Sequence, residues 1–297
     1  MPNSQPPIYL DYNATTPIHP EVASAICSCL DNIFGNPSSG HSYGVAAKEV
    51  VAAARQQTAR LICCAADEIV FTSGGTESDN HALKGYARAH AGRGRHIITS
   101  SIEHPAVFNV CRYMETQGYE VTYLPVDEYG MVQPDSVAAA IRDATILISI
   151  MHANNEVGTI QPIKAISKLA RSRNIVMHTD AAQSIGKIPC HVDELGVDLL
   201  TMAGHKLYAP KGVGALYVRA GIQLEPLLHG AAHEQGRRAS TENAAIIDYV
   251  GPVGYLERLT HVVIRNKHPD AERLKPNHDL LDIEDRERIY TRKRFIQ

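Results

Sequence analysis

Short apolar runs alternate with longer amphipathic segments through the middle of the chain. The apolar runs predict strands at 68–72, 96–100, 119–124, 144–151, 175–179, 199–202 and 214–218. The segments between them predict helices at 76–91, 104–117, 134–142 and 162–173. Strands that alternate with helices in this way form βαβ units, whose strands run parallel. The pattern therefore predicts an α/β fold with a mostly parallel sheet flanked by helices.

The chain before this repeat has its own pattern of apolar positions. Residues 8–10 predict a short strand that runs into a polar turn. Two helices are predicted next, at 20–30 and 44–62. In the first of them, the spacing of Val22, Ile26 and Leu30 predicts a common apolar face.

Polar clusters follow four of the predicted strands. They are residues 73–77, 103–104, 154–156 and 180–183. Ligands of open α/β sheets bind beyond the carboxyl ends of the strands. We therefore expect these four clusters to form one binding site at that edge of the sheet.

Lys206 and Asp180 are the first candidates for chemistry. Lys206 lies among glycines and a proline, where it is either an ordinary surface lysine or a desolvated amine able to form a Schiff base. Asp180 directly follows an apolar run, and a buried carboxylate needs a cation or a donor. A pyridinium nitrogen would serve, since an Asp at that nitrogen makes pyridoxal phosphate an electron sink. A helix N-cap is the alternative role for Asp180.

Other polar residues suggest anion and ring binding. The small residues at 73–77 join a strand to a helix and suit a phosphate, although they match no nucleotide-binding motif. His104 could stack on a planar ring and move protons, or cap a helix. Asn154 and Asn155 offer amides to a carboxylate or a phenolic oxygen. Residues 237–243 could bind a second anion or form a polar loop.

Composition narrows the class of protein. The 297 residues include 29 basic and 32 acidic side chains, a net charge of −3, which argues against nucleic acid as a partner. The chain has no apolar stretch of membrane-spanning length and no secretory signal at its start, so we expect no membrane association and a cytoplasmic location. The six cysteines lack zinc-ligand spacing, which predicts reduced thiols and no metal site.

Taken together, the motifs resemble the cysteine desulfurase and selenocysteine lyase family, within class V of the fold type I pyridoxal-phosphate enzymes. The matching text is YLDYNATTP (9–17), FGNPSS (34–39), FTSGGTESDN (71–80), EHPAV (103–107), ANNEVGTIQP (153–162), HTDAAQSIGK (178–187), GHKLYAPKGVGALY (204–217) and GRRASTEN (236–243). The resemblance implies a seven-stranded sheet, pyridoxal 5'-phosphate (PLP) as cofactor and a homodimer. It also implies removal of sulfur from L-cysteine, or selenium from L-selenocysteine, to give alanine. The sulfur would pass as a persulfide to a scaffold protein, for example in iron–sulfur cluster assembly.

The resemblance also implies roles around the cofactor ring. Lys206 would form the Schiff base with PLP and, once freed, remove the α-proton of the substrate. Asp180 would pair with the pyridinium nitrogen, and Gln183 would bind the phenolic oxygen. His104 would stack on the ring and help with proton transfer. Asn155 would contact the substrate carboxylate or a cofactor oxygen.

The phosphate-binding residues follow from the same resemblance. Gly75, Thr76 and His205 would hold the phosphate, and Thr241 would reach it from the other subunit of a dimer. Ser240 replaces a glycine that is common in the family, next to Thr241.

The resemblance to the family also divides the chain into three parts. They are a segment at 1–17, a PLP-binding large domain at 18–248 and a divergent charged tail at 249–297. We expect the tail to be solvated and partly disordered; a localisation or nucleic-acid patch at its basic end is the alternative. In the family, a small C-terminal domain carries the reactive cysteine, but no cysteine follows Cys190 here. That domain is therefore expected to be missing or replaced. A catalytically impaired form that binds PLP or a partner is an alternative function, and another class V enzyme is a third.

Overall fold

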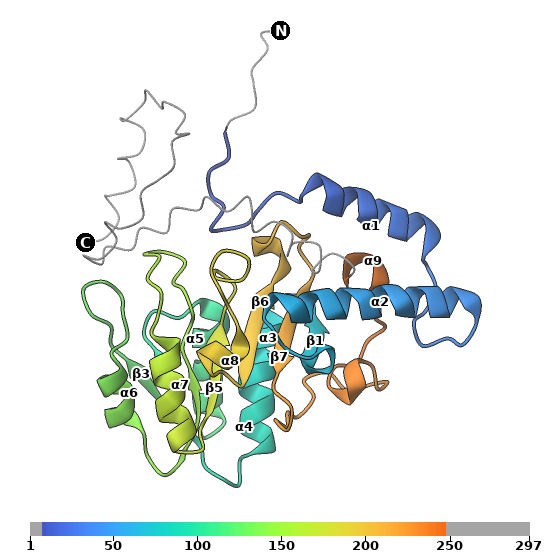
Figure 1. The fold of residues 1–297 in the computed structure, drawn as a ribbon. Coiled ribbons are helices and arrows are strands. Elements are labelled where there is room, and N and C mark those ends of the chain that lie inside the picture. The colour runs from blue at the N-terminus through green and yellow to red at the C-terminus, as the bar shows by residue number, and fades with distance from the viewer. Residues whose placement is uncertain (1–7, 248–297) are drawn as a thin grey trace. The chain divides into compact units, whose positions relative to one another are not determined.

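The computed structural model describes residues 8–247, and seven strands within them form one sheet. The strands are β1 (Ile69–Thr72), β2 (His96–Ser100), β3 (Glu120–Leu124), β4 (Thr145–Ser149), β5 (Val176–Asp180), β6 (Leu199–Ala203) and β7 (Gly214–Val218). Their order is β1-β7-β6-β5-β4-β2-β3 (Figure 1). Strand β7 runs antiparallel to both of its neighbours, and the other four pairs are parallel. The predicted mostly parallel α/β sheet is confirmed.

Helices cover both faces of this sheet. They are α1 (Pro20–Asn32), α2 (Ser42–Leu61), α3 (Gly75–Asn80), α4 (Tyr86–Ala89), α5 (Pro105–Thr116), α6 (Pro134–Ala140), α7 (Ile163–Ser172), α8 (Val192–Leu195) and α9 (Ala244–Ile247). One apolar core lies between the sheet and helices α2, α6, α7, α8 and α9. The other core lies between the opposite face and helices α4 and α5. Successive strand residues such as Ile97 and Ile98 alternate between the two cores, as the pleat of a β-strand requires.

The helix predicted at 76–91 is not a uniform α-helix. It runs as α3, a π-helical turn at His81–Gly85 and then α4, without a break. A π-turn inserts one residue into the helix, and such turns are frequent near functional sites. The apolar pattern did not predict the π-helical turn, because Ala82 and Leu83 are buried in it as they would be in an α-helix.

Two predictions for the N-terminal part are wrong. Residues 8–10 form no strand, and Ile8 and Leu10 are 87% and 79% exposed. An apolar run becomes a strand only where a neighbouring strand pairs with it, and no strand among residues 8–247 does so here. In α1, Leu30 is 62% exposed, and the buried positions are Val22 and Cys29. Leu30 lies about 100° further round the helix than Cys29.

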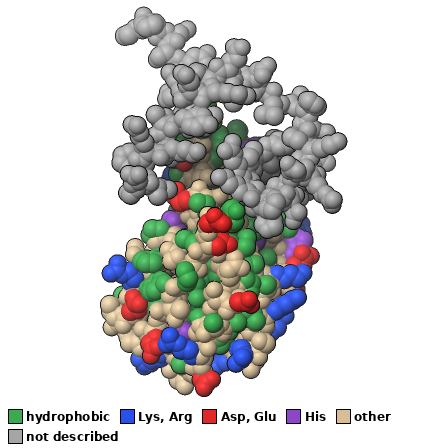
Figure 2. All heavy atoms as spheres, turned by 90° about the vertical axis from the view of Figure 1, so that its left-hand side faces the viewer, with side chains coloured by type: hydrophobic (Ala, Val, Ile, Leu, Met, Phe, Trp, Pro, Cys, Tyr) green, Lys and Arg blue, Asp and Glu red, His purple; other side chains and the backbone are tan. Residues whose placement is uncertain are grey.

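The predicted tail at 249–297 lies outside the described residues, and the proposed domain limits stay predictions. Within residues 8–247, no helix combines the length and the apolar character needed to cross a bilayer. On the described part of the face in Figure 2, basic and acidic side chains are interspersed and no single sign dominates.

Candidate active site

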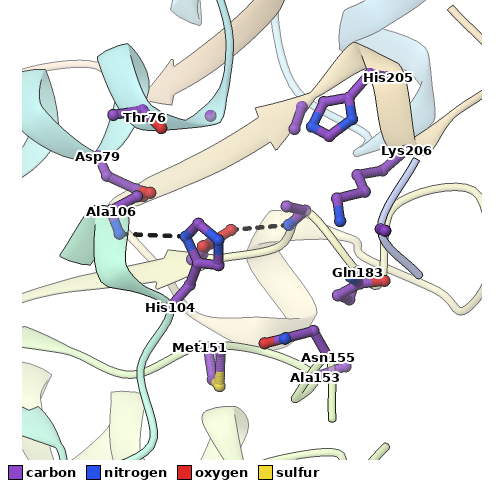
Figure 3. Close-up of a pocket in the computed structure, with 15 residues that line it drawn as sticks. Thr76, Asp79, His104, Ala106, Met151, Ala153, Asn155, Gln183, His205 and Lys206 are labelled. Carbon is purple, nitrogen blue, oxygen red and sulfur yellow. Dashed lines mark hydrogen bonds between the residues drawn. The ribbon is translucent and has the colours of Figure 1, made fainter. Parts of the chain in front are cut away.

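A pocket of about 240 Å³ opens beyond the carboxyl ends of the parallel strands (Figure 3). It is lined by Ala14, Gly75, Thr76, Asp79, His104, Ala106, Met151, Ala153, Asn155, Asp180, Ala182, Gln183, Ala203, His205 and Lys206. These residues follow β1, β2, β4, β5 and β6, or come from the N-terminal segment. The four polar clusters identified in the sequence therefore do meet in space, together with His205 and Lys206.

Lys206 ends a short 3₁₀ turn that directly follows β6. Its Nζ points into the pocket and donates a hydrogen bond to the backbone carbonyl of Asn13 (Figure 3). Burial lowers the pKa of the Lys206 amine, while the carboxylates of Asp180, Asp11 and Glu156 oppose this shift. The lysine therefore lines the pocket, and its role in forming a Schiff base stays a prediction.

Asp180 is the last residue of β5 and is 7% exposed. Its Oδ1 accepts a hydrogen bond from the Ala182 N–H at 2.9 Å. Burial raises the pKa of Asp180, and the Ala182 N–H and the charges of His104 and Lys206 act against this rise. Asp180 therefore caps the following turn and also lines the pocket, while its pairing with a pyridinium nitrogen stays a prediction.

Asp79 is a second pocket carboxyl, which the sequence analysis missed. It is 1% exposed, and neither oxygen has a hydrogen-bond partner of good geometry in the described residues. His178 Nε2 lies 3.6 Å from Asp79 Oδ1. Burial, together with the charge of Asp180, raises the pKa of Asp79 well above its usual range. Its four-residue spacing from Gly75 on one helix was the only available signal.

His104 caps α5 and faces the pocket at the same time. Its Nδ1 accepts a hydrogen bond from the Ala106 N–H at 3.2 Å. Because Nδ1 accepts, a neutral His104 carries its proton on Nε2. The exposed ring borders the pocket (Figure 3), so a planar ligand could lie against it.

The start of α3 forms the anion-binding corner of the pocket. The N–H groups of Gly75 and Thr76 belong to the first turn of the helix, where no carbonyl of the same helix accepts a hydrogen bond from them. Gly74 has a φ of 151°, which residues with a side chain rarely adopt, so the backbone conformation of this turn favours glycine. His205 Nδ1 lies 3.2 Å from the hydroxyl oxygen of Thr15. Burial and the charge of Lys206 lower the pKa of His205.

Thr241 does not line this pocket within a single chain. It borders a separate cavity of about 230 Å³, which Ser73 and Arg238 also line. The neighbouring Ser240 has a φ of 116°, a conformation that favours glycine. The expected reach of Thr241 into the site of another subunit stays a prediction.

The two asparagines have different roles. Asn154 donates to the Ile102 carbonyl at 3.1 Å, and its Oδ1 accepts from the N–H groups of Glu156 and Val157. It therefore shapes the loop. Asn155 lines the pocket, where its amide donates to Glu156 Oε1 at 2.8 Å.

Arg238 forms an ion pair instead of a second anion site. Its Nε and Nη2 lie 2.8 and 3.2 Å from the two oxygens of Glu77. The same carboxylate accepts the Ser73 N–H at 2.7 Å. These bonds hold the pKa of Glu77 below its usual range even though burial would raise it. The pair fastens the loop at 237–243 to the anion-binding corner, so the polar-loop alternative describes it better.

Among the described residues, no cysteine lines the pocket. Burial raises the pKa of Cys111 to about 12 and that of Cys190 to about 11, so neither is an activated thiolate near neutral pH. Within residues 8–247, no cluster of three potential metal ligands occurs.

Glu103 is a buried carboxyl next to two pocket residues, since it precedes His104 and binds the backbone of Met151. It leads to a prediction about the pH dependence of stability. Its Oε1 accepts from Ser100 Oγ at 2.6 Å and from the Met151 N–H at 3.0 Å, and burial raises its pKa from 4.5 to about 8. The folded chain therefore binds a proton here that the unfolded chain loses. Between pH 4.5 and 8, the Glu103 contribution to the unfolding free energy falls as pH rises, by an amount on the order of a few kcal/mol.

We expect Glu103→Gln to flatten this decline, as measured by urea unfolding of the apo chain at pH 5 and pH 8. Glu49 is an exposed glutamate on α2, and Glu49→Gln is the matched control, expected to leave the slope unchanged. Equal slopes in the wild type and the Glu103→Gln variant would show that Glu103 is already ionised at pH 5.

The family model of class V aminotransferases matches residues 8–244. The chain belongs to this family. The cysteine desulfurase IscS of Dictyoglomus turgidum is 54% identical over 82% of this chain and 62% of its own length. The IscS of Methanosarcina thermophila is 55% identical over 80% of this chain and 58% of its own length. The chain thus spans about three-fifths of these curated relatives.

Solved structures of the family have the same fold. SspA in complex with cysteine superposes with a TM-score of 0.81 at 41% identity, covering 83% of this chain and 72% of its own. DndA from Streptomyces lividans gives a TM-score of 0.74 at 37% identity, over 84% and 72% of the two chains. The seven-stranded fold type I architecture implied by the motifs is confirmed.

Members of the class V family, including the cysteine desulfurases, use PLP. The pocket of this chain fits that cofactor. It offers a desolvated amine on Lys206, a buried carboxyl on Asp180 and the free N–H groups of a helix start at Gly75. These three groups match the aldehyde, the pyridinium nitrogen and the phosphate of PLP, in that order. The ring of His104 matches the flat face of the pyridine ring, and the amide of Gln183 matches the phenolic oxygen.

Proposed function

We propose that this chain binds PLP in the pocket and is the cofactor-binding part of a cysteine desulfurase, which removes sulfur from L-cysteine to leave alanine. The observation that carries the proposal is the convergence of Lys206, Asp180, His104 and Gln183 in one pocket. Four curated relatives named cysteine desulfurase IscS, at 52–55% identity, support the reaction class. L-selenocysteine is the alternative substrate.

Each pocket residue would hold one part of the cofactor. Lys206 would bind the aldehyde carbon, Asp180 the pyridinium nitrogen and Gln183 the phenolic oxygen. His104 would cover one side of the ring. The helix start at Gly75 and Thr76, with His205, would hold the phosphate. When bound, PLP supplies an electron sink for the electron pair left behind when a proton leaves the α-carbon.

The side chains of the pocket would then transfer protons and stabilise the charges of the bound molecules. Burial lowers the pKa of Lys206, so its Nζ can lose a proton and take the α-proton of the amino acid. Asp180 would retain its negative charge against burial because Ala182 donates to it and Lys206 is close. The exposed Nε2–H of His104 is a second proton donor at the rim.

Sulfur removal needs a thiolate that attacks the substrate sulfur, and no cysteine lines the pocket in the described residues. A second candidate function is a PLP-binding protein that moves the α-proton but releases no sulfur alone. A homodimer, with Thr241 completing the phosphate site of the partner, and a sulfur-acceptor scaffold protein belong to the first candidate.

The test begins with borohydride reduction of the chain loaded with PLP, followed by peptide mass mapping. We expect the label on Lys206 and none in the Lys206→Ala variant. A label on another lysine, or none, would overturn the proposal. Exchange of the α-proton of L-alanine in deuterated water then measures proton removal without any thiol. Exchange with sulfide release from L-cysteine supports the desulfurase, and exchange without release supports the second candidate.

A further inference from the structure

Lys187 is a half-buried lysine one turn beyond Gln183, and none of the roles above uses it. The segment after β5 winds in successive turns, with the N–H groups of Ile185 and Lys187 bound to the carbonyls of Ala181 and Ser184. This winding places Lys187 on the same side as Gln183. Lys187 Nζ donates to Gln183 Oε1 at 3.0 Å.

The partners of Gln183 fix which way its amide points. A lysine ammonium can only donate, so the atom facing Lys187 must be the oxygen. The other end, Nε2, donates to the Asn13 carbonyl at 2.9 Å, and a carbonyl can only accept. A flipped amide would lose both bonds. The NH₂ group has a second hydrogen beyond the one given to Asn13, whereas the carbonyl is held by Lys187.

Lys187 has little else to bind. Within residues 8–247, it makes no ion pair, and Gln183 is its one side-chain hydrogen-bond partner. Burial and the charge of Lys206 lower its pKa to about 8, so it is still mostly protonated at neutral pH. A half-buried cation without a carboxylate is unusual, since such a charge is normally paired.

We propose that Lys187 is a positioning residue, which locks the Gln183 amide with its NH₂ group toward the pocket. The site thereby selects a hydrogen-bond acceptor at this point, and rejects a donor. That the acceptor is the phenolate oxygen of PLP rests on the proposed function. The locked amide itself is a property of the chain without any ligand.

The first experiment uses the apo chain. We follow the Gln183 side-chain amide by NMR, assigned with Gln183→Leu, in the wild type and in Lys187→Met and Lys187→Arg. We expect two well-separated NH₂ signals with slow exchange in the wild type and in Lys187→Arg, which keeps a charged donor. In Lys187→Met the chemical shifts of both signals should move toward those of a solvent-exposed Gln amide. Circular dichroism shows whether each variant is folded.

The second experiment measures PLP affinity by absorbance titration. Lys187→Met should weaken binding about five-fold, the effect of one disordered hydrogen bond. In the Gln183→Leu background the same substitution should change the affinity less than about two-fold, because Lys187 acts through Gln183. An equal loss in both backgrounds would mean that the lysine acts on PLP by its charge, which overturns the proposal.

The two proposals fail in different ways. An unchanged Gln183 amide signal in folded Lys187→Met overturns the role of Lys187, whether or not PLP binds. A wild-type chain that binds no PLP overturns the proposed function, while the amide signals still decide the role of Lys187.

Discussion

Replacing Asp180 by asparagine is expected to weaken PLP binding by about ten- to a hundred-fold. A hydrogen bond to a charged group contributes about 1.5–3 kcal/mol, and each 1.4 kcal/mol is about ten-fold in affinity. Asparagine keeps the shape of the side chain and loses the charge that a pyridinium nitrogen needs. The variant should also have a lower pKa at Lys206, because the charge of Asp180 raises it in the wild type. Absorbance titration at pH 7 measures the affinity, and α-proton exchange of L-alanine measures the consequence.

Asp79→Asn is the matched control, the same substitution in the same pocket. Two buried carboxyls close together cannot both ionise readily, and the charge settles on the one with better partners. Asp180 has the Ala182 N–H and the charges of Lys206 and His104, whereas neither oxygen of Asp79 is well bonded. Asp79 is therefore the protonated member, and Asn mimics it. We expect less than about a two-fold change in affinity.

Equal losses in the two variants would place the charge on Asp79 instead. A difference infrared spectrum of wild type against Asp79→Asn offers an independent check. It should contain the C=O stretch of a protonated carboxyl, which an ionised Asp79 would lack.

The sheet could be predicted closely because six of its seven strands are buried along their whole length. A buried parallel strand is a continuous apolar run that ends where polar residues begin. Strands 96–100 and 214–218 therefore have the predicted limits. The same reasoning located Asp180, which directly follows such a run, and Lys206, which comes a few residues after one, since parallel strands end at one edge.

Features that depend on distant partners could not be predicted. The residues at 8–10 have the composition of a strand, but no neighbouring strand pairs with them. Asp79 reaches the pocket because α3 packs across β6, a contact that its own neighbours in sequence do not encode. The contact of Lys187 with Gln183 depends on the turns after β5. Local pattern identifies an element and its end, whereas these contacts are decided by how elements pack.

The outer edge of β1 is another such feature. Strand β1 is the last strand on its side of the sheet, so half of its backbone groups have no strand partner. Arg55 Nη1 donates to the Ile69 carbonyl at 2.7 Å, and Glu234 Oε2 accepts the Phe71 N–H at 3.0 Å. Arg55 and Glu234 also pair through two contacts, at 2.6 and 2.7 Å. The ion pair thus takes the place of a missing strand and anchors the loop that leads to Thr241.

Arg55→Met is expected to lower the unfolding free energy by about 3–5 kcal/mol, because it leaves Glu234 buried without its cation. The side chain of Glu234 is only 2% exposed. Arg142→Met is the control: Arg142 also lies 2.6 Å from a glutamate, Glu120, but their side chains are 55% and 74% exposed. An exposed pair contributes about 1 kcal/mol or less, so this variant should unfold at nearly the wild-type urea concentration.

The decrease in unfolding free energy caused by Arg55→Met should also depend on pH, because it changes the charge around two carboxyls. Glu242 lies 3.3 Å from Arg55, and burial and the charge of Glu234 already raise the pKa of Glu242. Without the guanidinium, which lowers the pKa of Glu242, that pKa is higher in the folded chain, so folding takes up a proton. The deficit against the wild type should therefore shrink from pH 8 to pH 5 in urea unfolding. A deficit equal at both pH values, or no larger than that of Arg142→Met, would mean that the edge of β1 is held by packing and not by this pair.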